Sequence, residues 1–152
     1  IELLEQPVPA DDLEGMAAIR AAIRTPLLAD ECVFNARDAE RALAAGAADL
    51  LNVKLMKSGG LAGASRVVAV ARALGVSCLA GCMLESSIGA AAAAHFAVAN
   101  RDIVGCIDLD SPGLARFDPV DGNVVFDGPR ITVGDTPGLG IRAIAGLDLL
   151  DP

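Results

Sequence analysis

Short apolar runs alternate with alanine-rich stretches of helical periodicity along most of this sequence, and this alternation limits the fold more than any other feature. The predicted strands are residues 3–4, 26–29, 49–54, 76–80 and 103–109. The predicted helices are residues 11–23, 36–45, 61–74 and 87–98. Strands and helices that follow each other in this way form parallel βα units with right-handed crossovers. The strands also lack alternation of polar and apolar residues, which is typical of parallel strands covered on both faces.

Polar residues and glycines mark the ends of the predicted helices. Asp11 or Asp12 stands where the first helix needs an N-cap, and Asn35 stands at the same place before the second. Gly46 and Gly75 follow the second and third helices, where a glycine commonly ends a helix. The helix boundaries are therefore predicted independently of the apolar pattern.

The C-terminal part of the chain has a different pattern. Residues 123–126 and 130–133 flank an Asp-Gly-Pro turn and predict a β-hairpin. We therefore predict two regions: a layer of βα units in residues 1–115, and a hairpin with a tail in residues 116–152.

Composition excludes several classes of protein. With 152 residues and 53% hydrophobic content, the chain can form one buried core, which excludes a disordered protein. Its net charge of -8 without a Lys/Arg cluster argues against nucleic acid and against anionic membranes as partners. Alanine raises the mean hydropathy to +0.51, and no uncharged stretch reaches the length of a membrane span.

Two features of the sequence indicate the cellular compartment: the four cysteines and the first residues of the chain. Cys32, Cys78, Cys82 and Cys106 form no Cys-x-x-Cys pair, which favours free thiols in a reducing cytoplasm over disulfides or a zinc site. No signal peptide is visible at the start of the sequence. We therefore expect a cytoplasmic protein.

Ionisable residues recur where the predicted strands end. Glu5, Asp30 and Lys54 lie about 25 residues apart, and Asp108 lies two such intervals further on. One charged side chain per βα unit, at the carboxyl end of its strand, is how a (β/α)8 barrel builds an active site. Five strands cannot close such a barrel, so we expect the C-terminal part of a longer barrel, from its fourth strand onward. The alternative is a small self-contained α/β domain.

Glu5 and Asp30 directly follow apolar strand residues, where an unpaired carboxylate is costly to bury. Two carboxylates at one edge of a sheet favour a cation, and hard oxygen ligands suit Mg²⁺. The alternative is that each carboxylate pairs with an arginine or caps the following helix.

Lys54 is one of only two lysines, beside Lys57, in a chain that has ten arginines. Lysine, unlike arginine, can lose its proton near neutral pH when its surroundings lower its pKa. The strand periodicity of two places Asn52 and Lys54 on the same face. Lys54 is therefore a candidate general base, and the alternative is a lysine that only extends from a strand end into solvent.

Asp108 and Asp110 flank Leu109, so their side chains project to one side of the last strand. A pair of carboxylates near others already assigned to a metal would bind a second cation, such as a substrate ammonium group. The alternative is two solvated loop residues.

The residues above occur in four motifs: Leu4-Glu5-Gln6-Pro7, Ala29-Asp30-Glu31, Asn52-Val53-Lys54-Leu55-Met56-Lys57-Ser58-Gly59-Gly60 and Asp108-Leu109-Asp110. In combination they resemble the C-terminal barrel region of the enolase superfamily, muconate-lactonizing subgroup, and the Asp-x-Asp motif resembles that of its dipeptide epimerases. The resemblance implies an α/β fold, namely strands 4 to 8 of a (β/α)7β TIM-like barrel. It also implies that residues 116–152 pack on an N-terminal capping domain.

The resemblance further implies a Mg²⁺-dependent isomerase that epimerises a dipeptide by α-proton abstraction through an enediolate. It assigns Glu5 and Asp30 as Mg²⁺ ligands, Lys54 as an acid/base lysine, and Asp108 and Asp110 as partners of the dipeptide ammonium. Three neighbouring groups would tune the metal and the amine: Glu31, Asn52 and Lys57. The complete enzyme is expected to be a homo-oligomer.

The family's Lys-x-Lys strand, its third metal ligand and its capping domain have no counterpart in these 152 residues, so we expect this chain alone to be inactive. Within the same superfamily, the alternatives are muconate cycloisomerase and o-succinylbenzoate synthase, although neither substrate carries an ammonium group. An alternative of another class is an inactive fragment or an interaction domain.

Overall fold

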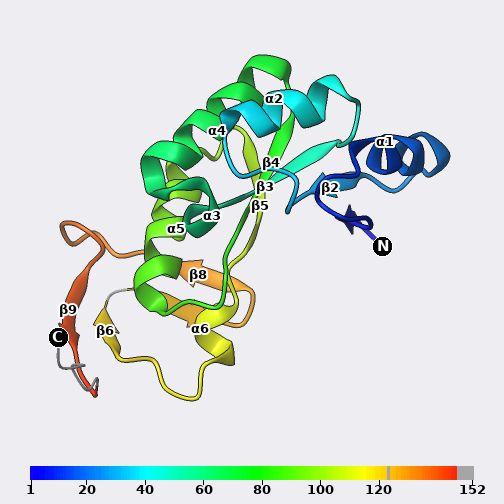
Figure 1. Ribbon diagram of the computed structural model, residues 1–152. Coiled ribbons are helices and arrows are strands. Elements are labelled where there is room, and N and C mark those ends of the chain that lie inside the picture. Colours follow the sequence, from blue (N-terminus) through cyan, green and yellow to red (C-terminus); the bar gives the residue numbers. More distant parts are fainter. Residues whose placement is uncertain (123, 147–152) are drawn as a thin grey trace, which may run out of the picture.

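In the computed structural model, which describes residues 1–122 and 124–146, five parallel strands form one sheet in the order of the chain (Figure 1). The strands are β1 (Leu4–Glu5), β2 (Leu27–Ala29), β3 (Leu50–Lys54), β4 (Ser77–Gly81) and β5 (Val104–Asp108). Each strand pairs in parallel with the next one in sequence. This sequential order confirms the predicted βα units, and it is the order of a barrel segment.

Helices connect the strands. They are α1 (Leu13–Ala22), α2 (Ala36–Ala44), α3 (Leu55–Ser58), α4 (Gly60–Leu74), α5 (Ser87–Ala99) and α6 (Ser111–Leu114). The Asp12 side chain accepts a hydrogen bond from the Gly15 N–H at the start of α1, and Asn35 accepts one from the Asp38 N–H at the start of α2. These contacts confirm the predicted N-caps, and Gly75, with a φ of 68°, ends α4 as expected.

The sequence does not predict α3, a single helical turn directly after β3. Gly59, with a φ of 78°, separates α3 from α4, which begins at Gly60, because a left-handed angle breaks a helix. The predicted helix at residues 61–74 is therefore only the second of two. The separation determines where the side chains of α3 point.

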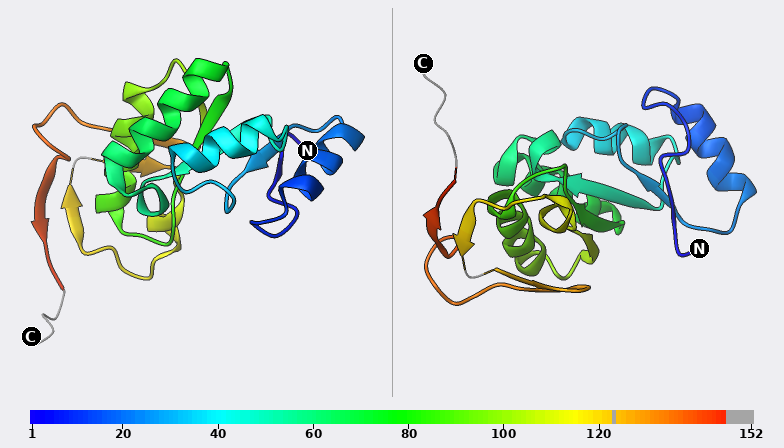
Figure 2. Two further views of the ribbon diagram at one scale, coloured as in Figure 1. Left: turned by 45° about the horizontal axis from the view of Figure 1, so that its top comes forward. Right: turned by 90° about the horizontal axis from the view of Figure 1, so that it is seen from below.

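Helices α2, α4 and α5 cover one side of the sheet (Figures 1 and 2). The residues between sheet and helices are nearly all small or branched aliphatic. They include Leu27, Leu51, Val53, Val67, Val68 and Phe96. The alanine-rich helices present alanines to this core, so the helices pack close to the strands.

The C-terminal region adds two small antiparallel sheets. Strand β7 (Val125–Asp127) pairs with β8 (Arg130–Thr132), which confirms the predicted hairpin apart from residue 123, which lies outside the described residues. Strand β6 (Val120–Gly122) pairs with β9 (Ile141–Ile144), a pairing that the sequence does not predict. The Asp118 side chain accepts hydrogen bonds from the backbone N–H and the hydroxyl of Ser87, and so ties this region to the start of α5.

Two expectations on compartment and membrane can be compared with this fold. All four cysteines are free thiols. Among the described residues, no helix combines the length and the apolar character that a membrane crossing requires. The tail of the predicted second region, from residue 147 on, lies outside the described residues, and its packing on a capping domain stays a prediction.

Candidate active site

The parallel sheet brings the charged strand ends to one edge. Glu5 is the last residue of β1, Lys54 of β3 and Asp108 of β5, and Asp30 directly follows β2. The strand register pairs Lys54 with Gly81, and Gly81 with Asp108. The structure thus places the four residues at the carboxyl ends of β1, β2, β3 and β5, as their spacing predicts.

Asp30 lies at the centre of the site and is bound by two lysines. Lys54 Nζ lies 2.6 Å from Asp30 Oδ2, and Lys57 Nζ lies 2.5 Å from Oδ1. Lys57 also donates to the Asp30 backbone carbonyl at 2.6 Å. The side chains are only 5% exposed for Asp30, 16% for Lys54 and 2% for Lys57. The sequence predicts Lys57 near the site, and this direct bond to the predicted metal ligand is a new finding.

Glu5 lies beside this cluster and is held by Asn52. The Asn52 amide donates from Nδ2 to Glu5 Oε1 at 2.7 Å, which joins the first strand to the third. Burial raises the pKa of Glu5 above its ordinary value, and the negative charge of Asp30 raises it further, although the Asn52 bond acts in the opposite direction. Two carboxylates close enough to oppose each other's ionisation favour a cation between them.

Asp30 and the two lysines bound to it shift each other's proton affinity. Burial by itself would raise the pKa of Asp30, but the hydrogen bonds and the positive charges of Lys54 and Lys57 together outweigh it and hold the pKa below its ordinary value. For Lys54, burial is the largest single influence and lowers the pKa, but the bond to Asp30 and the surrounding negative charges together outweigh burial, so the net pKa is raised. For the more deeply buried Lys57, burial dominates and the pKa is lowered. The two lysines therefore differ in how strongly they hold their protons.

Gln6 is a positioning residue that the sequence does not single out. Its Oε1 accepts hydrogen bonds from the backbone N–H groups of Asp30 at 3.0 Å and Cys32 at 3.3 Å. Its own backbone has a φ of 32°, which is strained for a residue with a side chain. This strain coincides with a contact that fixes the loop carrying Asp30. The place of Gln6 between the strand-end Glu5 and Pro7 is the one feature of the sequence that could have indicated it.

The oxygen donors fit a divalent cation such as Mg²⁺, which binds carboxylates and commonly takes only one or two of them from the protein. Glu5 and Asp30 are the two carboxylates that lie side by side at this edge. In residues 1–122 and 124–146, no group of three or more His, Cys, Asp or Glu side chains is arranged to hold a metal. Glu5 and Asp30 are therefore the candidate metal ligands among the described residues.

The remaining predicted residues form no hydrogen bond or ion pair with this cluster within the described part of the chain. Asp108 and Asp110 are exposed while Leu109 between them is buried, so both carboxylates face away from the core. Neither side chain has a hydrogen bond or an ion pair within the described part of the chain. Together with the β7–β8 hairpin they line a cavity of about 450 Å³. Glu31 is exposed and acts on the two lysines only through its charge.

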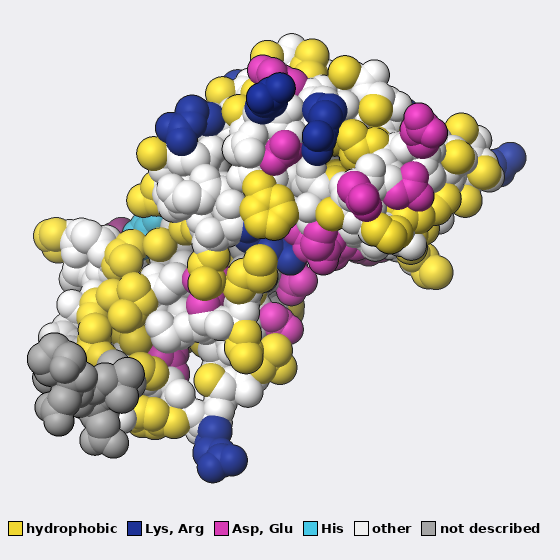
Figure 3. All heavy atoms as spheres, viewed as in Figure 1, with side chains coloured by type: hydrophobic (Ala, Val, Ile, Leu, Met, Phe, Trp, Pro, Cys, Tyr) yellow, Lys and Arg dark blue, Asp and Glu magenta, His cyan; other side chains and the backbone are white. Residues whose placement is uncertain are grey.

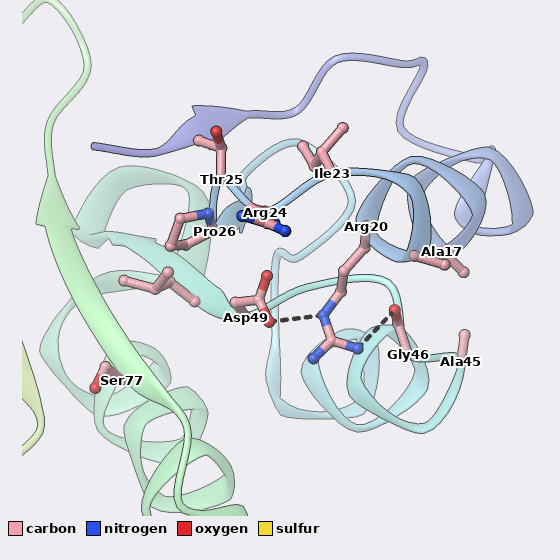
Figure 4. A pocket seen from close by; sticks show the side chains of 12 residues that line it. Ala17, Arg20, Ile23, Arg24, Thr25, Pro26, Ala45, Gly46, Asp49 and Ser77 are labelled. Carbon is pink, nitrogen blue, oxygen red and sulfur yellow. Dashed lines mark hydrogen bonds and ion pairs between the residues drawn. The ribbon is translucent and has the colours of Figure 1, made fainter. Parts of the chain in front are cut away.

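A larger cavity, of about 760 Å³, lies at the opposite end of the strands (Figure 4). Arg20 Nε lies 2.7 Å from Asp49 Oδ1 there, and Asp49 Oδ2 accepts a hydrogen bond from the Leu27 N–H at 2.9 Å. This ion pair joins α1 to the start of two strands. Chemistry in barrels takes place at the carboxyl ends of the strands, so we assign this end a structural role.

On the surface, acidic side chains gather near the middle of the molecule beside a largely covered basic one (Figure 3).

Comparison with known proteins identifies the family of this chain. The model of the enolase C-terminal domain-like family matches residues 1–144. The chain belongs to this family. A similar relative is the L-Ala-D/L-Glu epimerase of Bacillus subtilis, which is 45% identical over 145 residues, 95% of this chain and 39% of the relative.

Solved structures of this enolase-type family show the same fold. A substrate-liganded complex of the Bacillus subtilis L-Ala-D/L-Glu epimerase matches with a TM-score of 0.91 at 44% identity, covering 95% of this chain and 40% of that one. A dipeptide epimerase from Enterococcus faecalis, in complex with Mg and L-Leu-L-Tyr, matches with a TM-score of 0.88 at 39% identity, covering 93% and 40%. The chain thus spans about two fifths of the length of the relatives it matches, and its sheet is the C-terminal barrel part of such enzymes.

Proposed function

We propose that this chain is the C-terminal barrel part of a Mg²⁺-dependent dipeptide epimerase. The observation that carries the proposal is the Lys54–Asp30 contact beside Glu5, because it joins a proton-transferring amine to a pair of metal-binding carboxylates at one edge of the sheet. The relatives named as dipeptide epimerases support the substrate class.

In this proposal Lys54 moves the proton of the substrate's α carbon. Only a neutral amine accepts that proton and only an ammonium returns it, and lysine can take both forms, whereas arginine cannot. Asp30 and Glu5 raise the pKa of Lys54, contrary to the lowering expected of a base, so a cation held by these two carboxylates would be needed to offset their charge and favour the neutral amine. Glu5 and Asp30 would hold Mg²⁺. When bound, the metal would stabilise the negative charge that develops on the substrate carboxylate. A second proton-transferring group, for the opposite face of the α carbon, would come from the part of the complete enzyme outside these 152 residues.

The neighbouring polar groups have positioning roles in this proposal. Lys57 fixes one oxygen and the backbone carbonyl of Asp30, so that the other oxygen faces Lys54. Asn52 orients Glu5 through the bond at Oε1, and Gln6 fixes the backbone of Asp30. Partners of this kind keep metal ligands and their lone pairs in a productive orientation.

Asp108 and Asp110 would bind the free ammonium group of the dipeptide. Their carboxylates are exposed, carry no counter-ion within the described residues and line the same cavity. Muconate cycloisomerase and o-succinylbenzoate synthase are less well supported, because their substrates carry no ammonium group for these acids to bind.

The test is an assay of the complete protein with Mg²⁺ in D₂O, following epimerisation and α-proton exchange of L-Ala-L-Glu by NMR. We expect turnover of the free dipeptide, and a KM at least about tenfold higher for its N-acetyl derivative, since an ionic hydrogen bond contributes about 1.5–3 kcal/mol. Asp110→Asn should raise the KM of the free dipeptide and leave that of the N-acetyl derivative unchanged.

Three outcomes would count against the proposal. Equal turnover of free and acetylated dipeptides would remove the ammonium-binding role and reopen the cycloisomerase and synthase alternatives, which are then assayed with their own substrates. Turnover that persists after EDTA treatment would contradict the metal role. No turnover of any of these substrates would favour an interaction domain.

A further inference from the structure

Gly81 is the last residue of β4, lies opposite Lys54 in the strand register and is buried. A Cβ atom at this position would lie 2.5 Å from Asn52 Oδ1, 3.1 Å from Asn52 Nδ2 and 3.1 Å from Lys54 Cε. The first distance is shorter than any normal contact and the other two are unusually tight. Even a methyl group at position 81 would therefore displace two side chains of the candidate active site.

The backbone of Gly81 does not itself require glycine. Gly59 and Gly75 have left-handed φ angles that favour glycine, whereas Gly81 lies in an ordinary strand conformation. At position 81, then, glycine is required because a side chain would clash with the atoms that lie above the strand. The atoms that use this space belong to Asn52 and Lys54, both on the neighbouring strand β3.

Asn52 has little freedom to move away. It is 2% exposed, and its Nδ2 makes the bond to Glu5 Oε1. Its Oδ1 is buried without a hydrogen-bond partner among the described residues and faces the Gly81 position. A side chain at 81 would push the amide at its oxygen, and the displacement would be transmitted to the Glu5 bond. It would also push the Lys54 stem, which carries the amine 2.6 Å from Asp30.

We propose that Gly81 is a positioning residue of the active site: by lacking a side chain, it allows Asn52 and Lys54 to lie across β4 and so directs Nδ2 to Glu5 and Nζ to Asp30. The inference rests on the proposed function, because Glu5, Asp30 and Lys54 are its metal ligands and its base. It predicts that a methyl group on a strand that touches neither carboxylate alters both the metal site and the proton transfer.

The test compares Gly81→Ala with Gly105→Ala in the complete protein. Gly105 is also a strand glycine with an ordinary φ, and a Cβ there meets nothing within 4 Å, so it is the matched control. We expect Gly81→Ala to lower kcat about 100-fold, the loss typical of a displacement of about 1 Å. The KM should change little, since the ammonium-binding acids are not contacted.

Two further measurements separate positioning from general damage. Solvent exchange of the α-proton, measured from each epimer, should fall more for the epimer deprotonated by Lys54 than for the other, because the opposite base is not contacted. The Mg²⁺ affinity measured by calorimetry should fall at least about tenfold, as expected when the orientation of a ligand is lost. Equal losses of exchange from both epimers, or an unchanged Mg²⁺ affinity, would overturn the proposal.

The double variant Asn52→Ala/Gly81→Ala tests whether the loss in Gly81→Ala comes from the clash with Asn52 or from a general loss of folding. Without the Asn52 amide the closest contact disappears, so the second substitution should cost less than it does alone, a non-additivity typical of residues in contact. Additive losses would overturn the proposal. If the wild type does not turn over dipeptides, the proposed function fails. Gly81 is then tested by a crystal structure of Gly81→Ala, in which a lengthened Asn52–Glu5 distance supports the inference and an unchanged one refutes it.

Discussion

The two ends of the parallel sheet each hold a pairing of an aspartate with basic side chains, and the two pairings differ in burial and in number. At the amino ends of the strands, Asp49 and Arg20 form one ion pair with side chains 32% and 41% exposed. At the carboxyl ends, Asp30 is bound by Lys54 and Lys57, and all three side chains are far less exposed.

This difference indicates that the Arg20–Asp49 pair has a structural role, joining a helix to the sheet, whereas the cluster around Asp30 has a role in the proposed reaction. An exposed pair contributes about 0–1 kcal/mol and costs little to form. A buried cluster loses hydration of every charge, and well-packed apolar residues of the same size often give an equally stable protein. The cluster around Asp30 therefore has no advantage for stability that would explain its composition. The proposed function explains its composition: Asp30 would bind the metal together with Glu5, Lys54 would transfer the proton and Lys57 would position Asp30.

The largest effect is expected from Lys54→Arg in the complete protein. A guanidinium stays protonated and cannot accept the α-proton, so epimerisation should fall by about 10²–10⁴-fold or more. The measurement is the rate of epimerisation of L-Ala-L-Glu by NMR, and exchange from the epimer handled by the opposite base should survive. Arg20→Lys, the matched change at the other end, should leave the rate unchanged. A fully active Lys54→Arg variant would remove the distinction between the two ends.

The next effect concerns stability. Asp30→Asn removes the anionic partner of Lys57, whose side chain is 2% exposed, and leaves a buried ammonium facing a neutral amide. The free energy of unfolding should fall by about 3 kcal/mol, since an uncompensated buried charge is strongly destabilising. Urea denaturation of the complete protein without Mg²⁺ measures this. A loss below about 1 kcal/mol, the range of an exposed pair, would contradict the burial of this cluster.

Glu5→Gln should act in the opposite direction. The pKa of Glu5 is raised by burial and by Asp30, so its ionised form is disfavoured in the folded state. Glu5 therefore contributes fully to the free energy of unfolding below pH 4.5, its ordinary pKa, where it is protonated in both states. This contribution is lost as the pH rises through the raised pKa of the folded state. The variant should therefore melt at a higher temperature than the wild type at pH 7, in the presence of EDTA, and its advantage should shrink as the pH falls towards 4.5. A lower melting temperature at pH 7 would contradict the raised pKa of Glu5, and Mg²⁺ affinity should fall in either case.

The smallest effect is expected at the amino ends. Arg20→Gln breaks the ion pair with Asp49, while Asp49 keeps its bond to the Leu27 N–H. The free energy of unfolding should fall by less than about 1 kcal/mol, and activity should not change. The loss should also diminish at high salt, which screens exposed charges. A reduced kcat in this variant would indicate that the 760 Å³ cavity takes part in function.

The sequence predicts the sheet because its information is local. The apolar strand at residues 26–29, the Asn35 cap and the glycine after α4 each depend on neighbouring residues, and the structure confirms all three. Helix α3 is missed because four residues give no periodicity. The β6–β9 pairing is missed because its partners are separated by a long loop and by the β7–β8 hairpin.

The features of the candidate site also fall into those that local spacing predicts and those that depend on contacts between distant residues. Spacing alone places Glu5, Asp30, Lys54 and Asp108 at one edge, because every βα unit returns the chain to the same end of the sheet. The contact of Lys57 with Asp30 depends on the direction of an unpredicted helical turn. The steric role of Gly81 depends on where two side chains of another strand lie. Sequence patterns contain neither of these pieces of information.

Because α3 is a single helical turn, the direction in which Lys57 points depends on the number of residues between it and Lys54. An α-helix turns by about 100° per residue, so one residue added or removed between Lys54 and Lys57 would swing the second amine away from Asp30. The following left-handed Gly59 would then redirect α4 as well. Insertions and deletions are therefore excluded from residues 55–58 for a geometric reason, whereas substitutions at the exposed Met56 are not. An engineer who varies residues 55–58 can therefore change Met56 but not the length of the turn.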